Sequence, residues 1–168
     1  VEVWNEEWDS SSNNDAAVQL WYQWLNQGYH IYASVGTDIH GASDKTLGFN
    51  VVYAAARTEM AILDAVKQGH HYLSSEPQIE LTGVSSAGYG GMMGDSLHGD
   101  TYTISAQWDK CRAGDVIRFV VDGQVVDELD AQAQSSKTWD LSDNLWCVIE
   151  IRDSNHHMRA LTNPIFME

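Results

Sequence analysis

Residues 116–126, with the sequence VIRFVVDGQVV, decide how the second half of the chain folds. A run of β-branched and aromatic residues ends at Asp122-Gly123, and a second apolar stretch follows directly. Aspartate and glycine accept the positive φ angles of a two-residue type I′ turn. This stretch therefore predicts a β-hairpin.

Further short strands are predicted on both sides of the hairpin. Apolar and polar residues alternate at 102–108 and at 145–151, and residues 165–166 add a last apolar segment. Several short alternating strands separated by turn residues are typical of an antiparallel β-sandwich. We therefore predict a C-terminal β-sandwich domain at residues 78–168, with a long Gly-rich loop at 83–99.

The first half of the chain has a different pattern. Residues 17–25 carry apolar side chains at helical spacing, between expected strands at 1–5 and 30–35. A second strand–helix–strand series is expected within residues 50–74. Alternating strands and helices are the signature of α/β folds, so residues 1–77 are predicted to form part of an α/β barrel.

The charge of the chain narrows the choice of partners. Nine Lys and Arg stand against 24 Asp and Glu, which gives a net charge of -15. Such a surface repels nucleic-acid phosphates and anionic membranes. The sequence also has no apolar run of the ~18 residues that span a bilayer. We therefore expect neither nucleic acid nor a membrane as partner.

The sequence contains two cysteines, and it leaves open whether Cys111 and Cys147 form a disulfide.

The candidate chemistry lies in Gly36-Thr-Asp-Ile-His-Gly41, at the carboxyl end of an expected strand. In extended backbone, residues two positions apart point to the same side, so Asp38 and His40 could share one metal ion. Carboxylate oxygen and imidazole nitrogen are ordinary ligands of zinc and manganese. Two ligands alone leave such an ion under-coordinated. The alternative is a hydrogen-bonded loop aspartate and a surface histidine.

Several motifs follow one another in a recognisable order. They are VEVWN (1–5), the Trp-rich helix ending at Gly28, GTDIHG (36–41), AILDAVKQG (61–69), Asp122-Gly123, residues 146–152 and LTNPIF (161–166). Their order resembles that of PHP-superfamily metallohydrolases, and most of all the C-terminal part of the CehA/McbA branch, which includes carbaryl hydrolase.

The resemblance implies a distorted (β/α)7 barrel that holds two or three divalent ions, Zn, Mn or Fe. Asp38 and His40 match the family's last pair of metal ligands, and Asp38 would also orient the attacking water. Glu2 and Asn5 match a strand near the site without being ligands. The family's His-x-His and middle ligands have no counterpart here, so we expect a segment of the same protein upstream of Val1 to supply them.

The expected function is that of a C-terminal fragment of a metal-dependent hydrolase. The parent protein would cleave a phosphoester, ester or carbamate bond of a small-molecule substrate with metal-bound hydroxide. This chain alone is expected to bind metal weakly and to be inactive. The parent would be soluble, and a periplasmic or secreted location stays open. The alternative is a non-enzymatic module whose acidic β-sandwich binds a partner or a glycan.

Overall fold

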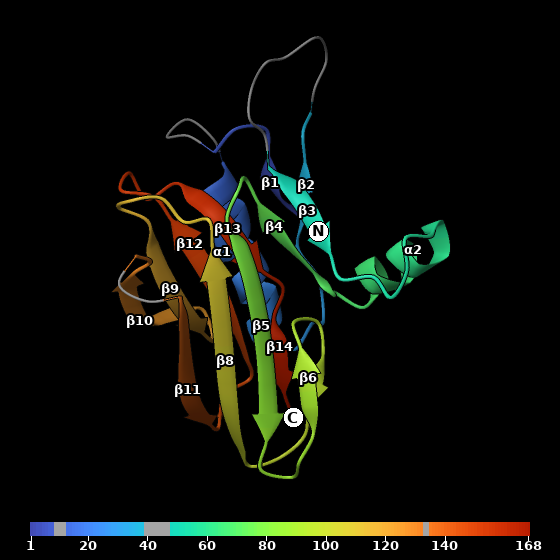
Figure 1. Cartoon of the computed structure of the whole chain (residues 1–168). Coiled ribbons are helices and arrows are strands. Elements are labelled where there is room, and N and C mark those ends of the chain that lie inside the picture. Colours follow the sequence, from blue (N-terminus) through green and yellow to red (C-terminus); the bar gives the residue numbers. More distant parts are fainter. Residues whose placement is uncertain (9–12, 39–47, 133–134) are drawn as a thin grey trace.

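The structure, a computed structural model, describes residues 1–8, 13–38, 48–132 and 135–168. These residues form three layers, in which a smaller sheet, a larger sheet and a helix-bearing layer lie one behind another (Figure 1). The elements are β1 (Glu2–Asn5), α1 (Asn14–Asn26), β2 (Ser34–Gly36), β3 (Phe49–Val52), α2 (Glu59–Lys67), β4 (His71–Ser74), β5 (Gln78–Ser85), β6 (Gly90–Met92), β7 (Ser96–Leu97), β8 (Thr101–Asp109), β9 (Val116–Val121), β10 (Gln124–Asp130), β11 (Ser136–Ser142), β12 (Trp146–Arg152), β13 (Met158–Thr162) and β14 (Ile165–Met167).

The two sheets pack face to face as a mostly antiparallel β-sandwich, as predicted for the second half. The smaller sheet has the order β11-β8-β5-β6, and the larger has the order β10-β9-β12-β13-β4-β3, with β14 pairing β12 and β7. Buried residues alternate with more exposed ones along β5 and β8. Their inward side chains, such as Leu81 and Ile104, share a core with Phe119 and Ile149 of the larger sheet. The alternation of buried and exposed residues has the period of two that the sequence pattern predicts for these strands.

The β9–β10 hairpin is confirmed. Gln124 pairs with Val121 across the turn, and Asp122 and Gly123 have φ angles of 50° and 82°. Both residues are thus in the left-handed region that a type I′ turn requires. The Asp122 carboxylate also accepts a hydrogen bond of 2.9 Å from the backbone N–H of Leu145. The turn is therefore attached to the start of β12.

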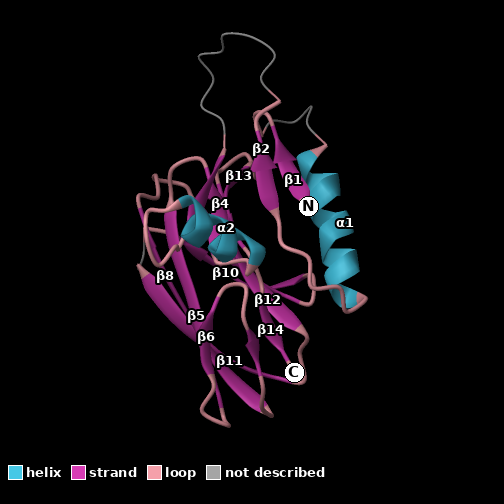
Figure 2. Cartoon of the chain, turned by 90° about the vertical axis from the view of Figure 1, so that its right-hand side faces the viewer, coloured by secondary structure: helices cyan, strands magenta, loops and turns pink. Residues whose placement is uncertain are grey.

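The third layer is a β1–α1–β2 unit on the outer face of the larger sheet. β1 and β2 are parallel, as a strand–helix–strand order predicts. The helix α1 buries Val18, Trp21 and Leu25 in a core that includes Val148 of β12. Figure 2 shows α1 lying along β1 and β2. The first half of the chain thus shares a hydrophobic core with the second half.

Asparagine side chains form hydrogen bonds with backbone groups on the outer edges of this parallel pair. The Asn14 carboxamide exchanges two hydrogen bonds, of 3.0 and 3.1 Å, with the backbone of Asn5. The Asn50 carboxamide does the same with Val35, at 3.1 and 3.2 Å. A carboxamide offers the donor and acceptor that a neighbouring strand would offer. On each edge, one residue is therefore hydrogen-bonded through its backbone without a neighbouring strand pair.

The strand expected at residues 30–35 is shorter than predicted, because β2 begins at Ser34. The backbone N–H of Ala33 donates to the Asn163 side chain at 2.7 Å, and the same side chain donates to the Ala33 carbonyl at 3.4 Å. A distant side chain thus replaces a neighbouring strand at this position. Apolar alternation cannot reveal such a contact.

The strands β3 and β4 belong to the larger sheet, where β4 pairs antiparallel with β3 and β13. The hydrogen-bonded sheet therefore continues across the predicted division between residues 1–77 and 78–168. That division stays a prediction. The β1–α1–β2 unit has the parallel order of an α/β barrel segment, whereas β3 and β4 do not.

The long loop predicted at residues 83–99 is wrong, because β6 and β7 lie within this segment. A Cβ atom at Gly83 would lie 2.7 Å from a methyl carbon of Leu97, and one at Gly94 would lie 2.2 Å from the Gln68 carbonyl oxygen. These glycines allow close packing between elements. In the sequence, the same glycines indicate a long loop.

The helix α2 projects away from the rest of the structure (Figures 1 and 2). Its N-cap residue Thr58 accepts a hydrogen bond of 3.3 Å from the Ala61 N–H. Ala65 is buried, but Met60 and Leu63 are 67% and 46% exposed. The apolar surface of α2 is thus left largely uncovered.

Within the described ranges, no helix has the length and apolar character needed to cross a bilayer.

The two cysteines are both free thiols, so they do not form a disulfide with each other. Cys147 is buried within β12, and Cys111 lies half-buried in the connection between β8 and β9. The hydrophobic core therefore holds the two sheets together without a covalent link between them.

Candidate functional site

The candidate site lies at the carboxyl ends of β1 and β2. Because the two strands are parallel, with Asn5 opposite Gly36, both end at the same edge, which is where α/β units carry their functional groups. Asp38 follows β2 by two residues and is exposed. His40 lies outside the described residues. Asp38 thus lies beyond the end of a parallel strand, and its role as a metal ligand and the position of His40 stay predictions.

Glu2 and Asn5 lie together beside this edge. The Asn5 carboxamide donates a hydrogen bond of 2.7 Å to Glu2 Oε1. A Cβ atom at Gly36 would lie only 1.8 Å from Glu2 Oε2. Glycine at position 36 is therefore what allows the Glu2 carboxylate to lie across β2, on the strand that leads to Asp38.

The local geometry at Asp38 differs from the expected one. Asp38 has a φ angle of 45°, which is the left-handed region and not extended backbone. Strand alternation therefore does not apply to Asp38 and His40, because β2 already ends at Gly36. Aspartate tolerates this conformation better than most residues. The pairing of Asp38 with His40 now depends on the resemblance alone.

The described residues do not form a complete metal centre. In that part of the chain, no group of three or more His, Cys, Asp or Glu side chains is placed to hold an ion. Zinc and manganese sites need at least three or four ligands. Asp38 could supply one carboxylate, and further ligands would have to come from outside the described residues.

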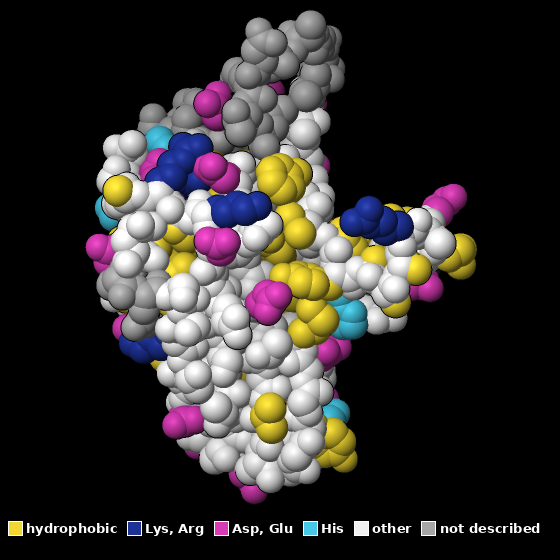
Figure 3. Space-filling view, in the orientation of Figure 1, with side chains coloured by type: hydrophobic (Ala, Val, Ile, Leu, Met, Phe, Trp, Pro, Cys, Tyr) yellow, Lys and Arg dark blue, Asp and Glu magenta, His cyan; other side chains and the backbone are white. Residues whose placement is uncertain are grey.

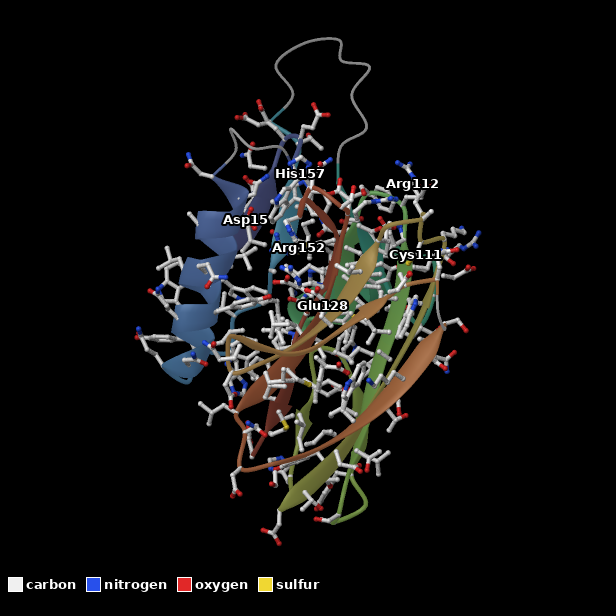
Figure 4. All side chains as sticks on the ribbon, turned by 90° about the vertical axis from the view of Figure 1, so that its left-hand side faces the viewer. Asp15, Cys111, Arg112, Glu128, Arg152 and His157 are labelled. Atoms are coloured by element: carbon white, nitrogen blue, oxygen red, sulfur yellow. The ribbon has the colours of Figure 1, made fainter. Side chains whose placement is uncertain are left out.

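A cavity of about 270 Å³ lies beside the end of β1. Figure 4 shows its residues His157 and Arg112 at the same end of the molecule, one near β1 and one across from it. The lining residues come from four distant segments and are Trp4, Glu7, Trp8, Ser75, Arg112, Asp153, His157, Met158 and Arg159. Sequence reasoning missed this cavity, because no local motif connects these positions.

The basic residues of this cavity are already paired with acidic ones. Arg112 and Arg159 both contact Glu76 Oε2, at 2.5 and 2.7 Å, and Arg159 also contacts buried Asp115 at 3.2 Å. Desolvation tends to raise the pKa of Glu76, but the two guanidinium groups outweigh it and hold the pKa below its usual value. The cavity thus offers little uncompensated positive charge to an anion.

Trp8 adds a donor to the lining of this cavity. Its indole Nε1 is buried, and no described residue accepts a hydrogen bond from it. The Arg152 guanidinium lies 5.7 Å from the centre of the Trp8 ring, so one ring face is occupied by a cation. A neutral group with an acceptor oxygen would suit this position.

Comparisons of the chain with models of known families, with curated proteins and with solved structures found no match.

Proposed function

We propose that this chain contributes the Asp38/His40 end of the metal centre of a PHP-type hydrolase that cleaves phosphoester, ester or carbamate bonds. The observation that carries the proposal is the β1–α1–β2 unit. Asp38 follows β2 at the edge where the parallel strand β1 ends at Asn5, and Asn5 bonds Glu2. The resemblance implies that a strand with Glu2 and Asn5 lies near the metal site.

Asp38 and His40 have the donor atoms that the proposed ions need. A carboxylate oxygen and an imidazole nitrogen suit Zn, Mn or Fe, and a bound ion would supply a water that ionises near neutral pH. The exposed Asp38 carboxylate would bind the ion and orient this water toward the substrate. Asn5 would hold Glu2 in place beside the site through their 2.7 Å hydrogen bond.

The surface of α2 supports a contact with further polypeptide. Met60, Ile62, Leu63 and Val66 are exposed along this helix, so apolar side chains face solvent on more than one side. Exposed apolar side chains gathered on one element mark an interaction surface. In the proposed enzyme, the rest of the barrel would cover α2 and would supply the remaining metal ligands.

Metal binding tests the proposal directly. Residues 1–168 are titrated with Co²⁺, whose visible absorption reports nitrogen and oxygen ligands, and with Mn²⁺ followed by water proton relaxation. We expect weak binding that EDTA reverses, and loss of most of this binding in Asp38→Asn and His40→Gln. In a longer polypeptide that includes the missing ligands, the same two changes should remove bound metal and hydrolysis of bis(p-nitrophenyl) phosphate.

Two matched variants control for unspecific effects. Asp143 is an exposed aspartate with a φ of 58°, and His156 is an exposed histidine with a φ of 65°. Asp143→Asn and His156→Gln should therefore leave metal binding unchanged. Equal metal affinity in all four variants would contradict the proposal. Hydrolysis of the phosphodiester by residues 1–168 alone would contradict the view that the site is completed elsewhere.

A non-enzymatic binding module is the second candidate function. The observation that favours it is a cavity of about 580 Å³ in the β-sandwich, whose lining includes none of Asp38, Glu2 and Asn5. On this hypothesis, Asp38→Asn and His40→Gln would alter neither metal content nor ligand binding. The metal titrations therefore separate the two functions.

A further inference from the structure

His71 is a buried histidine beneath the segment that leads into β2. Its Nε2 atom lies 2.8 Å from the carbonyl oxygen of Ala33, the residue before β2. Figure 3 shows histidine side chains of this protein in contact with solvent, whereas His71 is only 2% exposed. The proposed metal centre does not use this imidazole. A histidine held in such surroundings can couple the fold to pH.

Hydrogen bonds determine which imidazole nitrogen of His71 carries the proton. A carbonyl oxygen only accepts, so Nε2 donates to Ala33. The Asn163 amide nitrogen, 3.1 Å from Nε2, donates to the carbonyl oxygen of His71 at 2.9 Å. Nδ1 is therefore the unprotonated nitrogen. It is buried, and no described residue forms a hydrogen bond with it. A second proton would have to go on Nδ1, where it would find no acceptor.

The charges around His71 oppose its protonation. Those that act on it are the amine of Val1 and the side chain of His70, which are both positive when protonated. His70 itself contacts Asp95 at 2.8 Å, and the residue opposite His71 in β3 is the neutral Val52. Burial lowers the pKa of His71, and the hydrogen bond to a backbone carbonyl offsets this effect only in part.

The ring of His71 can reach water on one side only. β4 lies between β3 and β13 in the larger sheet, so the backbone of His71 is held on both edges. His71 and Leu73 face the same side of β4, because they are two positions apart. Leu73 packs in the core that contains Ala33 and Trp21. The layer over His71 is therefore the one that holds α1 and the segment between α1 and β2.

This segment is attached through side chains and has no strand partner. Residues 27–33 contain neither helix nor strand. The Trp21 indole N–H donates to the Ile31 carbonyl at 2.7 Å, and the Ala33 N–H donates to the Asn163 side chain at 2.7 Å. Segments attached in this way open locally at a lower free energy than core strands. Such an opening would let water reach the imidazole.

We propose that His71 makes this segment sensitive to acid, so that protonation of its ring releases residues 27–33 from the larger sheet and loosens β2, the strand that leads to Asp38. A charged imidazole needs water or an acceptor, and the closed structure offers Nδ1 neither. The open state binds the proton at the ordinary histidine pKa of about 6.5. Below that pH, the open population therefore grows by up to about tenfold per pH unit.

The release itself does not depend on the metal centre. Its consequence, a centre that loses Asp38 in acid, rests on the proposed function. Metal binding is not the readout, because protonation of His40 alone would also weaken it at low pH. A failure of the release and a failure of the proposed function are therefore seen in different experiments.

Hydrogen exchange followed by NMR on residues 1–168 tests the release. The reporter is the N–H of Ala33, and the reference is the N–H of Ser86, which donates to the Thr101 carbonyl at 2.8 Å at the end of β5. After correction for intrinsic exchange, we expect the protection of Ala33 to fall about tenfold from pH 7.5 to pH 5.5. The protection of Ser86 should stay the same. Equal protection of Ala33 at both pH values would overturn the proposal.

Low concentrations of urea distinguish local release from global unfolding. Local opening exposes little surface, so the protection of Ala33 should change little with urea. A urea dependence as steep as that of Ile104, in the core of β8, would show that only global unfolding exposes His71. That result would refute the release.

Two variants assign the effect to His71. His71→Gln can still donate to Ala33 but does not titrate, so the difference between the two pH values should disappear. His98→Gln is the matched control, because the His98 side chain is 57% exposed, and the difference should remain. A pH dependence that persists in His71→Gln, or that vanishes in His98→Gln, would contradict the assignment.

The ¹⁵N shifts of the His71 ring in the unchanged protein give a second measurement, which does not need His71→Gln to fold. An unprotonated Nδ1 in molecules whose Ala33 N–H is still protected supports the proposal. A ring that is fully protonated at pH 5.5, with Ala33 protected as at pH 7.5, refutes it.

Discussion

The strongest energetic prediction concerns Glu150, a buried carboxylate between the larger sheet and α1. Its two oxygens accept hydrogen bonds of 2.7 Å from the Tyr22 hydroxyl of α1 and of 2.7 Å from Arg152 Nε. Arg152 also donates to Asp15 of α1, at 2.8 Å. Figure 4 shows Arg152 and Asp15 facing each other between the sheet and the helix. We predict that Glu150→Ala weakens the attachment of α1 to the sheet.

The magnitude follows from burial. The side chains of Glu150 and Arg152 are only 4% and 7% exposed. Glu150→Ala therefore leaves the buried Arg152 guanidinium without its buried carboxylate partner, and its other partner, Asp15, is 61% exposed. Removing one partner of a buried ion pair costs about 3–5 kcal/mol. The free energy of unfolding of a domain is about 5–15 kcal/mol in total. The midpoint of thermal unfolding should fall by about 6–20 °C.

Urea denaturation followed by tryptophan fluorescence and by far-UV circular dichroism measures this loss. The matched control is Glu128→Ala, because Glu128 makes a 2.6 Å ion pair with Arg118 but is 47% exposed. Exposed pairs contribute about 0–1 kcal/mol, so the control should stay within that range. If Glu150→Ala lowers the free energy of unfolding no more than Glu128→Ala does, the reasoning from burial is refuted. A changed m-value would instead indicate that α1 detaches before the sandwich unfolds.

Three further predictions concern a histidine, the cysteines and a glycine. Burial lowers the pKa of His71, so below the unfolded-state value of about 6.5 the unfolded chain binds the extra proton. Stability should then fall as the pH decreases from 7 to 5, by up to about 1.4 kcal/mol per pH unit, and this slope should shrink in His71→Gln. Burial raises the pKa of the Cys111 thiol to about 11 and that of Cys147 further, so a thiol reagent at pH 8 should label Cys111 slowly and Cys147 only after unfolding. Gly94 has a φ of 98° and no room for a Cβ atom, so Gly94→Ala should cost about 2 kcal/mol or more in urea titrations, and a neutral effect would contradict the close packing described for this segment.

The β-sandwich could be predicted from sequence because its signals are local. The alternation along β8 and the Asp122-Gly123 turn depend on neighbours in the chain, and both appear in the structure as expected. The extent of β2 depends on Asn163, which is far away in sequence and bonds the backbone of Ala33. No periodicity reports a contact of that kind. Glycine at position 83 likewise has a role that becomes visible only when Leu97 is placed against it.

The candidate site could be predicted in part. The motif at residues 36–41 located Asp38 at the end of a parallel strand, and the structure agrees. Its backbone conformation was not predictable, since a φ of 45° at Asp38 depends on how the chain leaves the strand. The two cavities were also missed. Each is lined by side chains from several separate segments, which come together only in the folded chain.

The position of Asp38 depends on residues of the larger sheet and its connections as well as on its own strand. β2 is held on its outer edge by Asn50, which belongs to β3 of the larger sheet. The segment that leads into β2 is held at Ala33 by Asn163, which follows β13. Two parallel strands alone are too few to be stable in water. The sandwich therefore stabilises the β1–α1–β2 unit, because its asparagines hold the strand that leads to Asp38 in place.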